Sequence, residues 1–140
     1  NSTTIIYEGS LSEDMIKDKI IELDKEKKVL FIVKFGSSVK NEHNPMSDID
    51  IAIFYEGDED ERFSFRIKTS GILGEKYDVH IYQDLPLYLR NEIVKKHELV
   101  FSRDSFRTNE ILIRTIRDFS RFDKHLNNYY DSVKGDLFAR

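Results

Sequence analysis

Short apolar runs along the chain predict the strands of a sheet. The run VLFIVKF at 29–35 is apolar almost throughout, which is typical of a strand buried on both faces. The segment DIDIAIFY at 48–55 alternates aspartate with isoleucine and then becomes fully apolar, so it predicts a second strand with a polar end. Two shorter runs, at 77–82 and 98–102, predict a third and a fourth strand.

Apolar residues spaced by three or four predict helices between and before these strands. The first helix is expected from Ser10 or Ser12 to about Lys27, and another is expected over 85–97. The stretch 62–75 fits either a strand or a helix. We favour a helix there, because a crossover between parallel strands needs one.

The C-terminal part of the chain predicts one long amphipathic helix. Apolar residues recur at every third or fourth position from about Thr108 to Leu137. Such a helix would be ~40 Å long, whereas a compact fold of this size has a radius of gyration of only ~14 Å. The end of the helix should therefore overhang the domain, and its apolar stripe, which includes Tyr129 and Tyr130, should dock on a partner.

The order of these elements predicts an α/β fold in which a mixed sheet is flanked by helices. No linker, repeat or low-complexity stretch divides the 140 residues, so a single domain over 1–140 is expected. No apolar run approaches the roughly 18–20 residues that cross a bilayer, and the first fifteen residues contain no Lys or Arg. Neither a membrane span nor a secretory signal is therefore expected.

Composition narrows the classes of function. The chain contains no cysteine, which excludes a disulfide framework, a thiolate nucleophile and a zinc finger, and favours the cytoplasm. It has 22 Lys+Arg against 26 Asp+Glu, for a formal net charge of -4. This balance argues against nucleic acid as the main partner, because binding a phosphate backbone needs a concentrated basic face.

Three aspartates are the candidates for chemistry. Asp48 and Asp50 should project from one face of the second strand, because successive side chains of a strand alternate between its faces. Asp78 lies early in the third strand, and pairing of the two strands would bring it beside them. Three such carboxylates suit Mg²⁺ or Mn²⁺. From the Asp-x-Asp pair alone, a strand end whose acids simply face solvent is an equally good interpretation.

Two further features lie close to these acids. His80 follows Asp78 by two residues on the same strand face, so it could contact the site, although a histidine hydrogen-bonded at a strand end is the simpler interpretation. Gly36-Ser37 ends the first strand, where glycine allows a ligand to approach the backbone closely. A helical turn starting there would direct free N–H groups at a phosphate.

Gly36-Ser37, followed by ten residues and then Asp48-Ile49-Asp50, resembles the signature of the DNA polymerase β-like nucleotidyltransferases. The small size of the chain resembles the minimal nucleotidyltransferases (MNT), which pair with HEPN proteins in toxin–antitoxin systems. The resemblance covers roughly residues 28–134 and implies the polymerase-β-like fold with a long C-terminal helix.

The resemblance also implies roles for individual residues. Gly36 and Ser37 would hold the triphosphate of ATP, and Asp48 and Asp50 would bind two metal ions, Mg²⁺ or Mn²⁺. Asp78 would bind the catalytic metal and help to deprotonate an acceptor hydroxyl. The implied reaction is transfer of AMP to that hydroxyl, with pyrophosphate as the leaving group.

The acceptor is the harder question. Only one helix follows the sheet, so nothing in the chain walls off a small acceptor, and a second protein would best supply the missing wall. The resemblance implies a tyrosine of a HEPN toxin as the acceptor, which would make the chain an MNT antitoxin and a protein adenylyltransferase. The alternatives are an enzyme acting on a small-molecule hydroxyl, as aminoglycoside nucleotidyltransferases do, and a non-catalytic partner that neutralises its toxin. Self-association into a homo-oligomer is left open.

Overall fold

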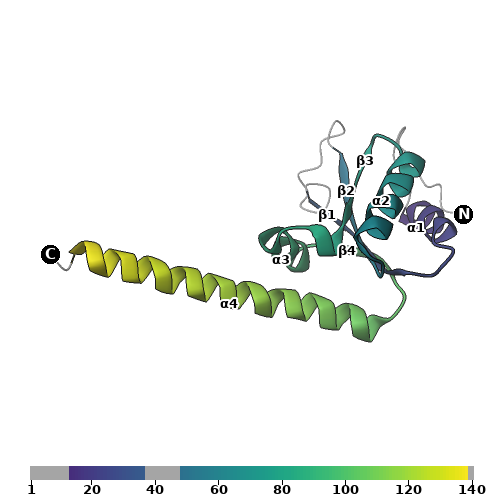
Figure 1. The fold of residues 1–140 in the computed structure, drawn as a ribbon. Coiled ribbons are helices and arrows are strands. Elements are labelled where there is room, and N and C mark those ends of the chain that lie inside the picture. The colour runs from purple at the N-terminus through teal and green to yellow at the C-terminus, as the bar shows by residue number, and fades with distance from the viewer. Residues whose placement is uncertain (1–12, 37–47, 139–140) are drawn as a thin grey trace, which may run out of the picture.

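A four-stranded mixed sheet forms the centre of the molecule (Figure 1). The computed structural model describes residues 13–36 and 48–138. Strand β1 lies between β2 and β4 and is antiparallel to both, whereas β3 lies at the edge and is parallel to β2. The strands are β1 (Val29–Phe35), β2 (Ile49–Tyr55), β3 (Tyr77–Ile81) and β4 (Glu98–Ser102). All four predicted strands are confirmed, and the sheet is mixed as expected.

Helices cover both faces of this sheet (Figure 1). The segment that fitted either a strand or a helix is helix α2, which carries the chain from β2 to its parallel neighbour β3. Asp58 fixes the start of α2, because its carboxylate accepts the N–H of Glu61 while Glu61 accepts the N–H of Asp58. The helices are α1 (Glu13–Leu23), α2 (Glu59–Leu73), α3 (Leu87–Lys95) and α4 (Ser105–Phe138), with a short 3-10 turn η2 (Tyr82–Asp84) after β3.

Two apolar layers hold the helices on the sheet. Helices α1 and α2 pack on one face against alternate residues of β2 and β3, whereas α3 and the first turns of α4 pack on the other. The first layer includes Ile16, Ile20, Ile51, Ile53, Phe65 and Val79, and the second includes Phe31, Val33, Ala52, Tyr82, Ile93 and Leu112. The alternate residues of β2 and β3 that do not belong to the first layer therefore point to the face covered by α3 and α4.

Helix α1 ends at Leu23, so the expected extension to about Lys27 is wrong. The cause is Asp24, whose carboxylate accepts the backbone N–H groups of Lys28 and Val29, each at 2.8 Å. The turn between them has Lys27 in the left-handed region, with φ 55. A short polar side chain that captures backbone N–H groups in this way competes with continued helix.

Asp24 also fixes the end of the sheet at which β1 begins and β4 ends. It is only 4% exposed, and its Oδ2 lies 3.2 Å from the guanidinium of Arg103. Arg103 donates through Nε to the carbonyl oxygen of Val29 and through its backbone N–H to that of Leu30. One carboxylate thus joins the entry of the central strand β1 to the residue that follows β4.

Helix α4 leaves the sheet after its first three turns. Tyr82 and Thr115 are both buried, and their hydroxyl oxygens lie 2.5 Å apart. Beyond that contact every residue of 121–135 is exposed, and Figure 1 shows the helix running far past the sheet. Its 34 residues correspond to ~51 Å, so the predicted overhang is confirmed. The side chains of 136–140, including Leu137 of the predicted stripe, lie outside the described residues.

The sequence led us to expect no segment that spans a membrane, and the helices can be compared with that expectation. Within the described ranges, none of the helices, α4 included, is both long and apolar enough to cross a membrane.

The buried carboxylate gives a test of the fold. We expect Asp24→Ala to lower the free energy of unfolding by about 3–5 kcal/mol, because it leaves two backbone N–H groups and the Arg103 guanidinium without their shared acceptor. Urea denaturation followed by circular dichroism measures the change.

A matched control is Glu56→Ala, which removes the exposed ion pair with Arg107 close to the same end of the sheet. That change should cost at most about 1 kcal/mol. Equal effects of the two substitutions would show that the Asp24 carboxylate does not organise this end of the sheet.

Candidate active site

The parallel pairing of β2 with β3 brings the candidate side chains together. In its register Asp50 lies opposite Asp78, and Ala52 lies opposite His80. All four project to the face that carries α3 and α4, because their neighbours in each strand fill the layer under α1 and α2. The pairing that the sequence predicted for Asp50 and Asp78 is therefore present.

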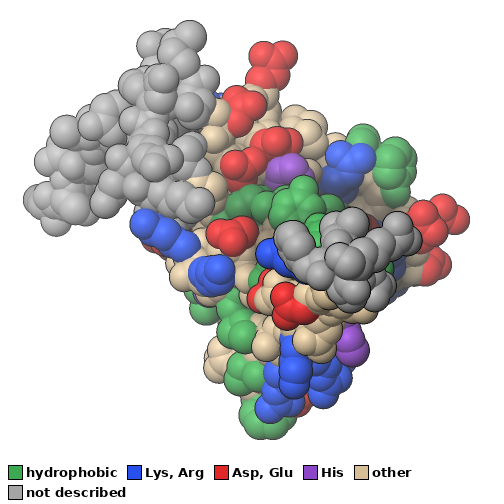
Figure 2. Space-filling view, turned by 90° about the vertical axis from the view of Figure 1, so that its left-hand side faces the viewer, with side chains coloured by type: hydrophobic (Ala, Val, Ile, Leu, Met, Phe, Trp, Pro, Cys, Tyr) green, Lys and Arg blue, Asp and Glu red, His purple; other side chains and the backbone are tan. Residues whose placement is uncertain are grey.

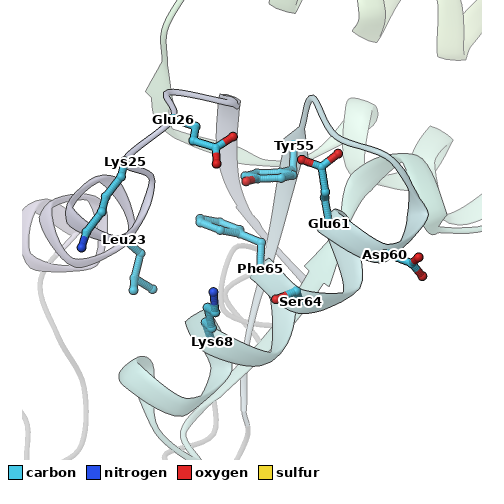
Figure 3. Close-up of a pocket in the computed structure, with 9 residues that line it drawn as sticks. All are labelled: Leu23, Lys25, Glu26, Tyr55, Asp60, Glu61, Ser64, Phe65 and Lys68. Atoms are coloured by element: carbon cyan, nitrogen blue, oxygen red, sulfur yellow. The ribbon is translucent and has the colours of Figure 1, made fainter.

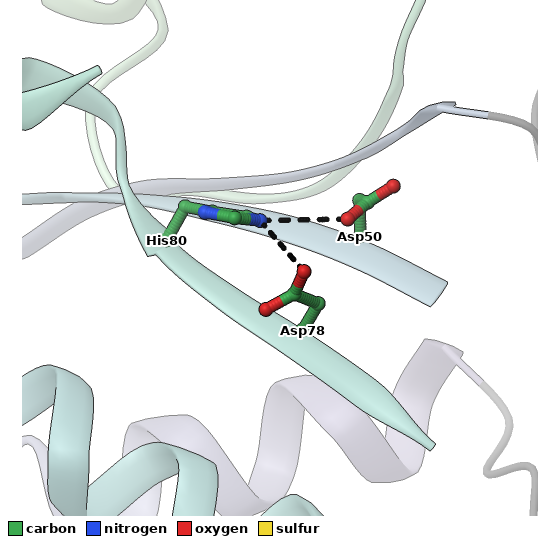
Figure 4. A group of neighbouring side chains, drawn as sticks. All are labelled: Asp50, Asp78 and His80. Carbon is green, nitrogen blue, oxygen red and sulfur yellow. Dashed lines mark hydrogen bonds and ion pairs between the residues drawn. The ribbon is translucent and has the colours of Figure 1, made fainter. Parts of the chain in front are cut away.

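His80 contacts both carboxylates (Figure 4). Its Nε2 lies 3.4 Å from Oδ1 of Asp50 and 3.4 Å from Oδ2 of Asp78. One ligand atom from each of the three residues lies within 4.8 Å of the other two. The space-filling view shows acidic side chains gathered beside a histidine on one open face (Figure 2). We call Asp50, Asp78 and His80 the acidic cluster.

The two acids raise the pKa of the histidine. The hydrogen bond to Asp50 raises the pKa of His80 above its ordinary value, and the negative charges of Asp78 and Asp50 act in the same direction. Burial of the ring and the more distant charge of Arg66 oppose them. The two acids thus favour the protonated form of His80, whose positive charge would offset part of their own negative charge.

Asp48 lies just before β2 and is exposed. It does not belong to the acidic cluster, but it lines a hollow of about 410 Å³ together with Asp78 and the last turn of α2. Asp48 and Asp78 thus line one hollow, at the end of the sheet where the chain enters β2. Its predicted role as a metal ligand stays a prediction.

Gly36 follows β1 and lies against Asp50. Its φ of +85 is in the region that glycine alone adopts freely, and a Cβ built there would overlap the Asp50 carboxylate. The sequence predicted a need for glycine at this position because of close phosphate approach, and the structure adds a second reason within the protein itself. Ser37, the other predicted phosphate-binding residue, lies outside the described residues.

The chemistry of the acidic cluster suits a divalent cation. Two carboxylates side by side repel each other, and oxygen ligands are those that Mg²⁺ and Mn²⁺ prefer. Sequence reasoning left His80 out of the metal site, although its spacing of two from Asp78 placed it on the right face. The residues present thus fit a metal, with Asp50 and Asp78 as ligands and the imidazole of His80 within reach.

Comparison with known families decides the class of protein. Residues 18–106, more than half of the chain, match the family described as Polymerase beta, Nucleotidyltransferase. The chain belongs to this family. It is a nucleotidyltransferase, and the sheet with its flanking helices is the polymerase-β-like fold that the sequence led us to expect.

Individual relatives agree with this assignment. The nucleotidyltransferase is 32% identical over 114 residues to MJ1547 of Methanocaldococcus jannaschii, which bears the name of a protein adenylyltransferase; the match covers 81% of this chain and 88% of the relative.

Two solved structures share its fold. One is a toxin–antitoxin crystal structure with AMP-PNP (TM-score 0.66, 20% identity, 89% of this chain and 99% of that chain). The other contains a tri-AMPylated Shewanella oneidensis HEPN toxin with its MNT antitoxin (TM-score 0.62, 20% identity, 88% and 99%).

A separate hollow of the nucleotidyltransferase lies on the other face of the sheet (Figure 3). It measures about 410 Å³ and lies between the end of α1 and the start of α2, with the stacked rings of Tyr55 and Phe65 in its wall. Two of its three acidic residues, Glu26 and Glu61, are already paired with Lys28. No residue of the acidic cluster lines it, so we assign the chemistry to the acidic cluster and not to this hollow.

The contact between Gly36 and Asp50 gives a second test. Gly36→Ala should weaken Mn²⁺ binding at least about tenfold, because the new methyl group would overlap the Asp50 carboxylate and displace it from its present position in the acidic cluster. Isothermal titration of the purified protein with Mn²⁺ measures the affinity.

Gly74→Ala is the matched control, because Gly74 has a similar φ of +92 but nothing lies within 4 Å of its added Cβ. Both substitutions carry the same kind of backbone strain, of roughly 1–2 kcal/mol, but only Gly36→Ala should change the metal affinity. If the two variants bind Mn²⁺ equally well, Gly36 does not shape the metal site.

Proposed function

We propose that the chain is a metal-dependent protein adenylyltransferase that transfers AMP from ATP to a tyrosine of a HEPN-type partner, as an MNT antitoxin. The observation that carries the proposal is the pairing of Asp50 with Asp78 on adjacent strands of a nucleotidyltransferase fold. Support for a protein acceptor comes from the name of the relative MJ1547 and from the fold shared with MNT antitoxins in complex with HEPN toxins.

In the proposed site, Gly36 and Ser37 bind the triphosphate, and Asp48, Asp50 and Asp78 are the catalytic and metal-binding residues. A bound Mg²⁺ or Mn²⁺ would neutralise charge on the phosphates and on the attacking and leaving oxygens. The side chains of Asp50 and His80 are less than a third exposed, so the acidic cluster is half-enclosed while Asp78 remains open to an acceptor.

The proposed reaction is an in-line displacement at the α-phosphorus of ATP. The tyrosine oxygen forms a bond to that phosphorus, the bond from the phosphorus to the bridging oxygen breaks, and pyrophosphate leaves. The phenolic proton passes to the carboxylate of Asp78 and then to water. Positioning of the two reactants would contribute most of the rate, as in other phosphoryl transfers.

An open site and a helix without cover favour a protein acceptor over a small molecule. Both hollows that include Asp78 open to solvent, and no further domain of the described chain encloses them. The exposed stripe of α4 offers a large apolar surface for the partner. It includes Phe122, Leu126, Tyr129, Tyr130 and Val133. Because ATP is a cytoplasmic substrate, the proposal places the reaction in the cytoplasm.

The proposal predicts labelling of a protein. Incubation with α-labelled ATP and Mg²⁺ should label little by itself, and addition of the proposed HEPN-type partner should give a labelled tyrosine on that partner. Autoradiography and mass spectrometry of the product measure the transfer.

The double variant Asp48→Asn, Asp50→Asn should abolish labelling while its melting temperature stays the same or rises, because repelling charges are removed. Asp60→Asn, in the exposed first turn of α2, is the control and should retain full transfer. Efficient labelling of an aminoglycoside without a second protein, or an unlabelled partner that the chain nevertheless inhibits, would contradict the proposal.

A further inference from the structure

The free edge of β3 lies directly beside the acidic cluster. Strand β3 pairs only with β2 among the described strands, so its other edge has no strand beside it. The N–H of Ile49 donates to the carbonyl oxygen of Lys76 at 2.9 Å, which sets the ladder so that Asp78 and His80 bond to β2. The N–H and C=O of Val79, between them, point to the free edge, and an edge of this kind can accept another strand.

Neighbouring elements limit how long this free edge is. At one end the N–H of Tyr77 donates to the carbonyl oxygen of Gly74, at the end of α2. At the other end the chain turns into η2, where Gln83 bonds to the backbone of Tyr55 in place of a further β3 residue. The edge therefore has room for about three residues of an added strand, centred on Val79.

A hollow of about 270 Å³ follows the free edge. Residues 78–81 line it along the strand, and Arg66 of α2 and Leu85 form its walls. We call this hollow the edge groove. It lies beside the acidic cluster, because Asp78 and His80 belong to both.

Arg66 gives the edge groove an uncommitted positive charge. Its guanidinium lies 5.2 Å from the centre of the exposed Phe63 ring, and among the described residues it forms no ion pair. The nearby Asp84 is held by Arg62, whose Nε lies 3.1 Å from each of its carboxylate oxygens. An acidic side chain that enters the edge groove would therefore find Arg66 available.

We propose that the edge groove binds the acceptor segment of the partner protein in extended form, as a short strand added to β3. This inference rests on the proposed function. A residue opposite Asp78 in the added strand would project its side chain to the face of the acidic cluster, within the roughly 4.5–5.5 Å between Cβ atoms of paired residues. A tyrosine there would lie across the acidic cluster, and the residue beside it would point to the α2 side, toward Arg66.

In the proposed mode of binding, the edge groove and the rest of the interface with the partner have different roles. Two or three backbone hydrogen bonds and one charge contact give little affinity alone, so the rest of the partner must hold the segment in place. The edge groove would thus select an extended segment with an acidic residue next to its tyrosine, while affinity comes from elsewhere on the partner.

Charge reversal tests the role of Arg66. With the HEPN protein as acceptor, Arg66→Glu should raise KM for the protein at least about tenfold and leave KM for ATP unchanged. Lys68→Ala is the matched control, because Lys68 lies on the same helix but lines the hollow on the other side. An increase in KM for ATP instead would assign Arg66 to the nucleotide and overturn the proposal.

Hydrogen exchange tests the backbone pairing directly. In the complex of the full chain with the HEPN protein and a non-hydrolysable ATP analogue, exchange at the amides of Val79 and Ile81 should slow markedly. Transfer of AMP without slower exchange there would refute the edge groove but leave the proposed function standing. If the wild-type chain labels no HEPN protein, the proposed function fails and this inference fails with it.

Discussion

The parallel pairing of β2 with β3 is the constraint on which the candidate site depends. It places Asp50 opposite Asp78, and the side chain of His80 contacts both of them. Two carboxylates brought together in this way repel each other, so the arrangement persists because apolar residues on the other face of the same strands hold the register. Ile51, Ile53 and Val79 form that anchor. A slip of either strand by one residue would turn its aspartate toward the core under α1 and α2, and the cost of burying that charge excludes the slip.

The site could be predicted from the sequence to the extent that it depends on local pattern. The alternation in 48–55 placed Asp50 on a strand face, and the apolar run around Asp78 identified its neighbour. His80 was visible only as a residue on the same face, because its contact with both acids depends on which strands are adjacent and on their register. The place of Asp48, outside the acidic cluster but in the wall of a hollow that Asp78 also lines, depends on where β2 begins. The ends of strands are weakly encoded in a sequence.

The fold, like the site, was predictable from the sequence only where it depends on local pattern. Helix types and strand positions followed from hydrophobic spacing, including the choice of helix for α2. The early end of α1 did not, because Asp24, which accepts the N–H groups of Lys28 and Val29, is also bonded to Arg103, 79 residues away in the chain. No local pattern reveals such a contact. The length of α4 was predictable from its stripe, whereas the point at which it leaves the rest of the fold, after Thr115, depends on where Tyr82 and α3 lie.

The acidic cluster as a metal site is the central claim, and anomalous scattering from crystals grown with Mn²⁺ and a non-hydrolysable ATP analogue tests it most directly. We expect a manganese peak bonded to the carboxylates of Asp50 and Asp78, with the α-phosphate of the nucleotide beside it. A peak bound elsewhere, with both carboxylates still in contact with His80, would contradict the claim.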